Sequence, residues 1–190
     1  MNTISYPLSV CGLIVFLAHC ACSQNVQNVP IVTVCQALSD RTQFDGKTII
    51  VVGRLFSTDE GIWLRAQCDS PLTIDGHVWP SMMSLTYSRW DLESPPPEMP
   101  KQFAWNTDIL RERFALLRES SKPGPPRERA RWIAVYGRFE TREALFFEGS
   151  DGIPRRYGFG HLNAAAAQLI SASASCEWVR GGCRPASSSR

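Results

Sequence analysis

Two histidines, His77 and His161, are the only imidazoles that follow the first 23 residues of the chain. A hydrolase needs a nucleophile, a general base and an orienting group that converge in one site. Neither histidine lies in a known catalytic spacing, and the chain has no G-x-S-x-G, P-loop or H-E-x-x-H motif. We therefore assign no catalytic residue, and we keep a small hydrolase that uses His161 with an acidic partner as an alternative.

Residues that could hold a metal or a cofactor are equally scarce. Structural zinc sites use closely spaced cysteine and histidine pairs, and the sequence contains no C-x-x-C. The segment Gly158-Phe159-Gly160 lacks the third glycine and the preceding strand of a dinucleotide-binding loop. We expect neither a metal nor a cofactor.

Aromatic and basic side chains are the residues best suited to ligand binding. Six tryptophans exceed the needs of a small core, so some could serve as stacking platforms. A net charge of +2 is far below that of a typical nucleic-acid-binding domain, and between residues 101 and 131 arginines alternate with glutamates. We therefore do not expect nucleic acid as a partner. The candidate ligand-binding residues are Trp63, Arg54, Arg138, Tyr136 and His161.

The first 23 residues carry no charged side chain and contain an apolar run over residues 8–18. This run is too short to span a bilayer and resembles the apolar core of a signal peptide, followed by the small-residue site Ala21-Cys22-Ser23. We expect cleavage before Gln24 and export to the periplasm, the cell envelope or the medium. Two alternatives remain: a lipoprotein signal with a lipid anchor on Cys20, although His19 stands where a small residue is usual, and an uncleaved membrane anchor.

Four cysteines remain after the signal peptide, an even number that suits an exported, disulfide-bonded chain. Three pairings are open to Cys35, Cys68, Cys176 and Cys183. We favour Cys35 with Cys68 and Cys176 with Cys183, because two glycines between the latter let the chain turn back.

The elements that must position these side chains are mainly strands. With 44 % hydrophobic residues, the 190-residue chain can bury the core of one domain. A short lead-in over residues 24–33 precedes a helical turn at 34–38. Strands are predicted at 47–55, 62–66, 81–87, 131–139 and 166–172, with 144–147 as a hairpin partner of the fourth. A Pro-rich loop at 94–100 and a helix at 108–120 separate the third strand from the fourth, and the helix has Leu110, Phe114 and Leu117 on one face. Residues 176–190 are expected to form a cysteine loop and a flexible tail.

Glycines inside two of these strands indicate bends, as occur where strands curl around a small barrel. Gly46-Lys47 before a β run with Gly53, and a closing strand pair around Val135-x-Gly137, resemble the OB-fold. More narrowly, the chain is similar to a group of exported bacterial proteins of unknown function. The motifs that carry this similarity are Val34-Cys35-x-Ala37-Leu38, Gly46-Lys47, Gly53-Arg54-Leu55, Trp63-Leu64 with Cys68, and Gly158-Phe159-Gly160-His161-Leu162 before Gln168-Leu169.

The resemblance implies a small OB-like Greek-key barrel over residues 34–175, with one inserted α-helix and the Pro-rich loop, and it implies no known activity. We expect an exported, non-catalytic binding or interaction module. Its partner is an unknown ligand or protein of the envelope or the medium. OB barrels commonly bind oligonucleotides or oligosaccharides, which remains an alternative to the small hydrolase.

Overall fold

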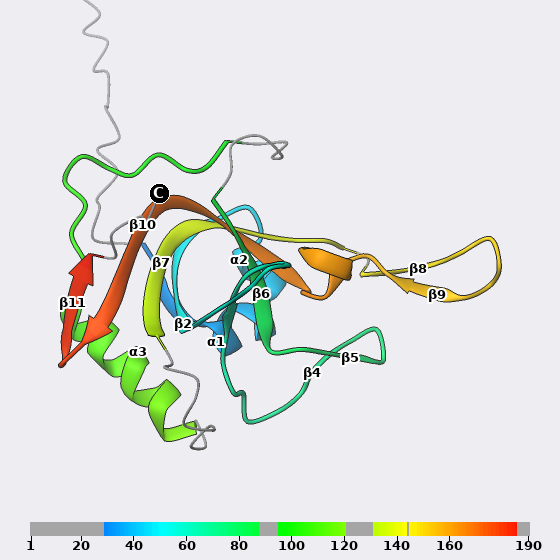
Figure 1. Cartoon of the computed structure of the whole chain (residues 1–190), viewed down its shortest axis with the longest axis horizontal. Helices are drawn as coiled ribbons and strands as arrows, with labels where there is room; N and C mark the ends of the chain where they lie inside the picture. The colour runs from blue at the N-terminus through cyan, green and yellow to red at the C-terminus, as the bar shows by residue number, and fades with distance from the viewer. Residues whose placement is uncertain (1–28, 88–94, 121–130, 144, 186–190) are drawn as a thin grey trace, which may run out of the picture.

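The computed structural model describes residues 29–87, 95–120, 131–143 and 145–185 (Figure 1). The expected signal peptide, the cleavage site before Gln24, the lipid-anchor alternative at Cys20 and the last five residues lie outside the described residues.

Strands dominate the fold, which is mainly β as the sequence predicts. The strands are β1 (Ile31–Thr33), β2 (Thr48–Thr58), β3 (Gly61–Arg65), β4 (Leu72–Ile74), β5 (His77–Trp79), β6 (Met82–Thr86), β7 (Arg131–Thr141), β8 (Phe146–Glu148), β9 (Pro154–Arg156), β10 (Ala167–Val179) and β11 (Gly182–Pro185). The helices are α1 (Val34–Ser39), α2 (Arg41–Phe44) and α3 (Thr107–Ser120), with a short 3-10 turn at His161–Asn163.

Seven of the strands form one mixed sheet. β2 pairs antiparallel with both β3 and β7, and β3 pairs antiparallel with β6. β10 pairs parallel with β6 and antiparallel with β7, so the pairings of these five strands return to their starting point. β1 adds to β2 in parallel, and β11 adds to β10 in an antiparallel hairpin.

The apolar run on β2 is buried on both of its faces. Ile49 and Val51 lie in a central cluster with residues of β3, β6, β7 and β10, whereas Ile50 and Val52 lie in a second, helix-side cluster under α3. Successive side chains of a strand point to opposite faces, so a strand covered on both sides reads as a continuous apolar run. This double burial explains why the run at 49–52 shows no alternation of apolar and polar residues.

The helix α3 covers one outer face of the sheet, on the side away from the β8–β9 hairpin (Figure 1). Leu110, Phe114 and Leu117 are all buried in the helix-side cluster, as their spacing predicts. The Phe114 ring stacks on Trp178 of β10 with 4.8 Å between ring centroids. No described helix is long and apolar enough to cross a membrane.

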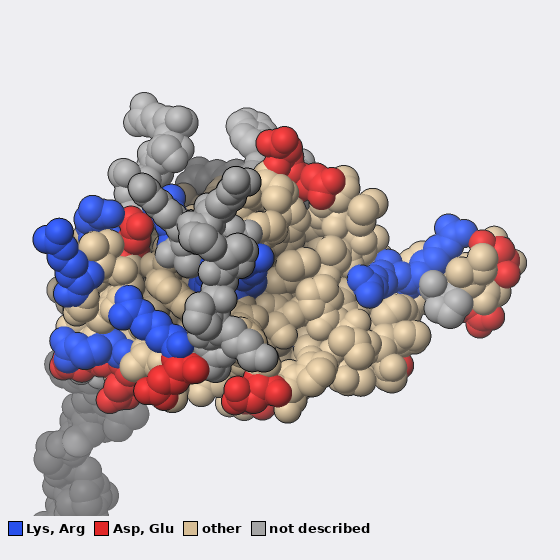
Figure 2. Space-filling view, turned by 60° about the horizontal axis from the view of Figure 1, so that its bottom comes forward, with Lys and Arg blue, Asp and Glu red and all other residues tan. Residues whose placement is uncertain are grey.

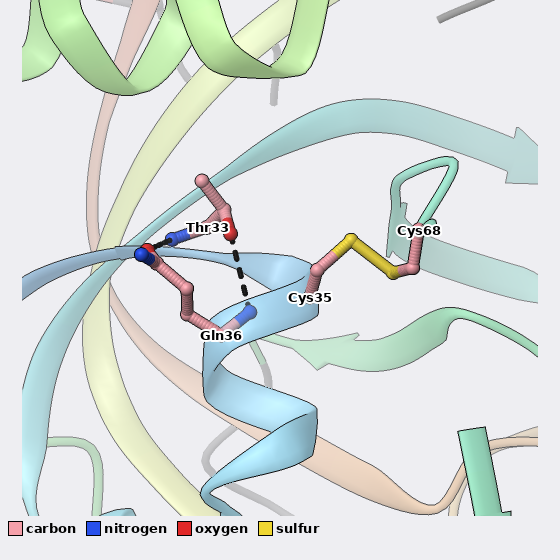
Figure 3. Close-up of a disulfide and its surroundings, with 4 residues drawn as sticks. All are labelled: Thr33, Cys35, Gln36 and Cys68. Carbon is pink, nitrogen blue, oxygen red and sulfur yellow. Dashed lines mark hydrogen bonds between the residues drawn. A yellow bond between two sulfur atoms is a disulfide. The ribbon is translucent and has the colours of Figure 1, made fainter. Parts of the chain in front are cut away.

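The other two helices cover one end of the central cluster, into which α1 and α2 bury Val34, Leu38 and Phe44. The first turn of α1 is fixed by a reciprocal cap (Figure 3). The Thr33 hydroxyl accepts a hydrogen bond from the Gln36 amide at 3.2 Å, and the Thr33 amide donates to the Gln36 side chain at 3.0 Å. Such a cap satisfies two helix-terminal donors at once.

Two disulfides join the four cysteines in the pairing that the sequence favours. Cys35 of α1 is bonded to Cys68, which follows β3, with a Cα separation of 5.6 Å (Figure 3). Cys176 is bonded to Cys183 across the β10–β11 hairpin. Disulfides persist in oxidising compartments, so the pair indicates an oxidising, exported environment.

Three sequence predictions about the strands need correction. Residues 146–148 pair with β9 rather than with β7, because both edges of β7 are already taken by β2 and β10. The last strand continues past 172 to Val179 and pairs with β11, so the segment that the Cys176–Cys183 disulfide closes is a hairpin of the sheet. Within the expected lead-in, Ile31–Thr33 forms β1.

Glu177 ties three strands together and should make part of the stability depend on acid. Its carboxylate accepts hydrogen bonds from Arg184 of β11 at 2.8 Å and from Arg131 of β7 at 3.4 Å. The hydrogen bond from Arg184 is the largest effect on the pKa of Glu177; burial opposes it, and the hydrogen bond from Arg131 adds to it, so that the pKa lies below its ordinary value. A lowered folded-state pKa contributes stability that is present above the unfolded-state pKa and lost as the pH falls through the folded-state pKa.

We therefore expect Glu177→Gln to lower the free energy of unfolding by up to about 1 kcal/mol at pH 7, the range of surface ion pairs. The difference from the wild type should begin to shrink as the pH falls below about 4, where the unfolded-state carboxyl takes up a proton, and should vanish once the folded-state carboxyl is protonated as well. Urea unfolding at pH 7 and pH 3 measures this, with Glu119→Gln on α3 as the control. A difference that stays the same at both pH values would contradict the assignment.

Candidate functional site

A hollow of about 720 Å³ opens where β6, β7 and β10 meet the residues that connect β7 to β10. Its floor comes from alternate residues of the three strands, and its wall from Arg142 and residues 157–160 with Asn163. The alternating partners of the floor residues, such as Phe139 and Leu169, point into the central cluster. The hollow therefore lies on the outer face of the sheet, and its volume is in the range of small-ligand sites.

The floor is a row of polar side chains that are direct neighbours across the strands. The register pairs Trp63 of β3 with Ser84 of β6, Ser84 with Gln168 of β10, and Gln168 with Glu140 of β7. The Gln168 amide donates to the Glu140 carboxylate at 2.8 Å, and Arg138 donates to the other carboxylate oxygen at 2.9 Å. Neighbouring strands lie about 4.8 Å apart, so the polar groups from Ser84 to Glu140 extend over about 10 Å.

Arg142 holds the wall of the hollow in place. Its guanidinium donates to the backbone oxygens of Tyr157 at 3.2 Å and Gly158 at 2.8 Å. The same guanidinium lies 3.9 Å from the Tyr157 ring centre and 4.4 Å from the Phe159 ring centre, at cation–π distance. The Arg142 backbone oxygen in turn accepts a hydrogen bond from Arg41 at 3.0 Å. The wall is thus fixed by side chains of the protein itself.

The two glycines of the wall are required by close packing. A Cβ on Gly158 would lie 2.6 Å from the backbone oxygen of Asn163. Gly160 has φ +71°, and a Cβ there would lie 3.1 Å from the Ser84 hydroxyl and 3.3 Å from the Trp63 indole nitrogen. Gly158-Phe159-Gly160 is therefore a close-packed wall of the hollow.

A comparison with known protein families, with curated proteins and with solved structures finds no match to this chain.

Trp63 and His161, two of the residues singled out in the sequence, lie beside Gly160 at one end of the wall, although neither lines the hollow itself. The Trp63 side chain is only 5 % exposed, since Gly61 and Gly160 pack against it, so it offers no open stacking surface. Its indole N–H is buried and has no hydrogen-bond partner among the described residues. His161 Nε2 lies 3.7 Å from a carboxylate oxygen of Glu60, and both side chains are exposed, at 44 % and 62 %.

The other three sequence candidates do not converge on this end. Arg138 borders the hollow through its ion pair with Glu140. Tyr136 lies in the helix-side cluster and its hydroxyl donates to the Glu98 backbone oxygen at 3.3 Å; burial raises the pKa of this hydroxyl, which keeps it a donor. Arg54 lies 5.9 Å from the ring centre of Trp132. The five candidates therefore belong to at least two separate places.

The main residues of the hollow were missed in the sequence, although a local signal exists for them. Ser84 is a polar residue between Met83 and Leu85, and Gln168 stands in the same way between two buried apolar residues. A lone polar residue inside an apolar strand marks the face that points away from the core. What the sequence does not contain is the register that brings these residues together from three strands.

No metal site is found in this region or elsewhere within the described ranges, where no three His, Cys, Asp or Glu side chains come close enough to hold an ion.

Charged side chains at the α3 end of the molecule are interspersed, with basic and acidic residues side by side (Figure 2). Arg111 pairs with Asp108 at 3.0 Å on α3, and Glu177 pairs with both Arg131 and Arg184. An alternating, self-compensated surface of this kind gives little attraction to a polyanion.

We therefore expect no binding of single-stranded oligonucleotides tighter than roughly micromolar at physiological salt. Fluorescence anisotropy with labelled oligonucleotides measures this. Arg127 and Arg129, the two arginines of the expected basic region that lie outside the described residues, are included in the test as alanine variants. A submicromolar, salt-sensitive affinity that these two substitutions abolish would overturn the expectation.

Proposed function

We propose that this chain is an exported, non-catalytic binding module whose ligand occupies the hollow between β6, β7, β10 and the residues that connect β7 to β10. The observation that carries the proposal is the row Ser84, Gln168 and Glu140, which lines a hollow of about 720 Å³ on the outer face of the sheet. The face over β1, β2 and β11 is instead covered by α3. A concave site with a few convergent polar groups is the usual form of a ligand-binding site.

We further propose that the five strands whose pairings form a closed circuit make up an OB-like barrel. The support is the circuit β2, β3, β6, β10, β7 and back to β2, with α3 between β6 and β7, the third and fourth of these five strands along the chain. OB barrels bind ligands on the face of their second and third strands and in two flanking loops. The corresponding parts here are β3, β6, the turn after β2 and the residues between β7 and β10. The contact of Glu60 with His161 brings these two loops together beside the hollow.

A small hydrolase is the weaker alternative. Glu60 is the acidic partner that His161 would need, at 3.7 Å. Nucleophilic catalysis also requires a hydroxyl or thiol within hydrogen-bond reach of the base. Among the described residues, no serine, threonine or cysteine side chain is hydrogen-bonded to His161, which favours binding over catalysis.

Export is supported by the two disulfides and by the charge-free apolar run before Gln24. We expect the mature protein to begin at Gln24, and the intact mass of the exported form tests this. A mass that includes a diacylglycerol on Cys20 would establish the lipoprotein alternative instead.

The binding proposal is tested by filling the hollow. Thr86 lines it, so Thr86→Trp should occupy part of its volume, while Leu116→Trp on the exposed face of α3 is the matched control. Both variants are checked for folding by thermal unfolding. A panel of oligosaccharides, oligonucleotides and peptides is then screened against all three proteins.

We expect at least one probe to bind the wild type and the Leu116→Trp variant equally, and to bind the Thr86→Trp variant at least about tenfold more weakly. Binding that the filled hollow leaves unchanged would show that the ligand site lies elsewhere. Turnover of a probe that His161→Ala abolishes would favour the hydrolase.

A further inference from the structure

We infer that the hollow takes an uncharged, hydroxyl-rich ligand, namely a segment of a neutral oligosaccharide, and not a polyanion. This inference rests on the proposed function, since it names the class of ligand for the same site. It follows from the charges at the hollow, from the type of hydrogen-bonding groups on its floor, and from the exposed Tyr157 of its wall.

The charged groups of the hollow leave no cation for a phosphate or a sulfate. The lining holds two carboxylates, Asp45 and Glu140, and one guanidinium, Arg142, while Arg138 borders the hollow through its ion pair with Glu140 at 2.9 Å. Arg142 already donates to two backbone oxygens and lies over two aromatic rings. Arg138 compensates the charge of Glu140, so the charged groups at the hollow sum to about zero, whereas phosphate sites usually depend on an excess of arginine, lysine or converging backbone N–H groups. The charge balance therefore disfavours nucleic acids and acidic polysaccharides.

The floor offers neutral groups that both donate and accept hydrogen bonds, as sugar hydroxyls do. Ser84, Thr86 and Asn163 contribute two hydroxyls and an amide to the lining. Gln168 uses its amide nitrogen for Glu140, and its carbonyl oxygen accepts no hydrogen bond from another described residue. That oxygen is an acceptor for a ligand hydroxyl, and the Glu140 carboxylate beside it is a second one.

The wall supplies the apolar surface that the C–H face of a sugar ring needs. Tyr157 lines the hollow and is 48 % exposed, whereas Phe159 behind it is buried under the same guanidinium and only supports the wall. Sites for neutral ligands combine such aromatic side chains with a few fixed polar groups. A row of polar groups about 10 Å long beside an aromatic wall fits a chain of two or more sugar units better than a single small molecule.

The test compares neutral and anionic probes on the same variants of the full exported, disulfide-bonded chain. The neutral probes are the hexasaccharides of cellulose, starch and N-acetylated chitin. The anionic probes are a heparin hexasaccharide, a polygalacturonate hexamer and a twelve-residue oligothymidylate. Binding is measured by calorimetry or by ligand-observed NMR at low and at physiological salt.

We expect at least one neutral hexasaccharide to bind with a Kd at or below roughly 1 mM and with no dependence on salt. Gln168→Ala should weaken this binding by about fivefold, and Tyr157→Ala by about tenfold. Leu116→Ala, on the exposed face of α3, should leave the affinity unchanged. Thermal unfolding of each variant separates lost binding from lost folding, and Gln168→Ala keeps the test valid if Tyr157→Ala does not fold.

The outcomes separate this inference from the proposed function. If anionic probes bind the wild type but bind Thr86→Trp much more weakly, and no neutral probe binds, the ligand class is overturned while the proposed binding module stands. A neutral saccharide that binds all variants equally would overturn the inference, because the ligand would then lie outside the hollow. If no probe of any class distinguishes the wild type from Thr86→Trp, both the inference and the proposed function fail.

Discussion

Replacing Gly137 with alanine is expected to lower the free energy of unfolding by about 2 to 3 kcal/mol, the upper part of the range for overpacking a core. Gly137 lies in β7, where the chain is paired with both β2 and β10. A Cβ at this position would lie 2.6 Å from the backbone oxygen of Ile170 and 3.0 Å from the Leu169 side chain. A backbone oxygen cannot turn aside as a flexible side chain does, so β7 and β10 would have to move apart.

Urea unfolding of the wild type and two alanine variants measures this effect. Gly182→Ala is the matched control, because a Cβ there would meet nothing closer than the Val179 oxygen at 3.9 Å. The control should stay within about 0.5 kcal/mol of the wild type, as most surface substitutions do. Equal stabilities for the two variants would mean that the close approach of β7 and β10 at Gly137 is not required.

The sequence was informative about Gly137 for a physical reason. A glycine inside a β-branched run gives up packing, so it marks a place where another chain segment comes close or where a strand bends. The irregularity itself lies on the partner strand, since β10 shifts register between Ser171 and Ala174, and Ser173 has φ +62°. A residue can thus report a bend nearby without identifying which strand carries it.

The apolar face of α3 was equally predictable, because the spacing of Leu110, Phe114 and Leu117 is fixed by helix geometry alone. The pairing of β8 was not. A short apolar run after a strand and a turn usually returns to the same strand, but both edges of β7 are occupied by strands that lie far away in sequence. Partner choice in a sheet is decided by these long-range pairings, which no local pattern contains.

The candidate site could be predicted in part for the same reason. Ser84 and Gln168 each interrupt an apolar strand, so their outward direction follows from alternation, and Glu140 follows the buried Phe139 near the end of β7. Their convergence depends on the parallel pairing of β6 with β10, which joins segments that are more than eighty residues apart in sequence. Aromatic and basic residues, chosen for their chemistry, were therefore weaker guides than lone polar residues in strands.

The largest loss of stability is expected from removal of the Cys35–Cys68 disulfide. The bond closes a separation of 33 residues, and the loop-closure estimate for that length is about 3.7 kcal/mol. It also holds α1 against the end of the central cluster, where Val34, Ala37 and Leu38 are buried. The helix α1 has only six residues and one N-terminal cap, and a helix of this length is not stable by itself.

We therefore expect the double variant Cys35→Ser with Cys68→Ser to lose about 3 to 4 kcal/mol in the free energy of unfolding. The control is the double variant Cys176→Ser with Cys183→Ser, which opens a separation of 7 residues and should lose only about 2.4 kcal/mol by the same estimate. Denaturant unfolding compares the two, and hydrogen exchange of the α1 amides shows whether the helix opens locally. An equal or smaller loss in the first variant, with α1 still protected from exchange, would show that packing alone holds α1 over the central cluster.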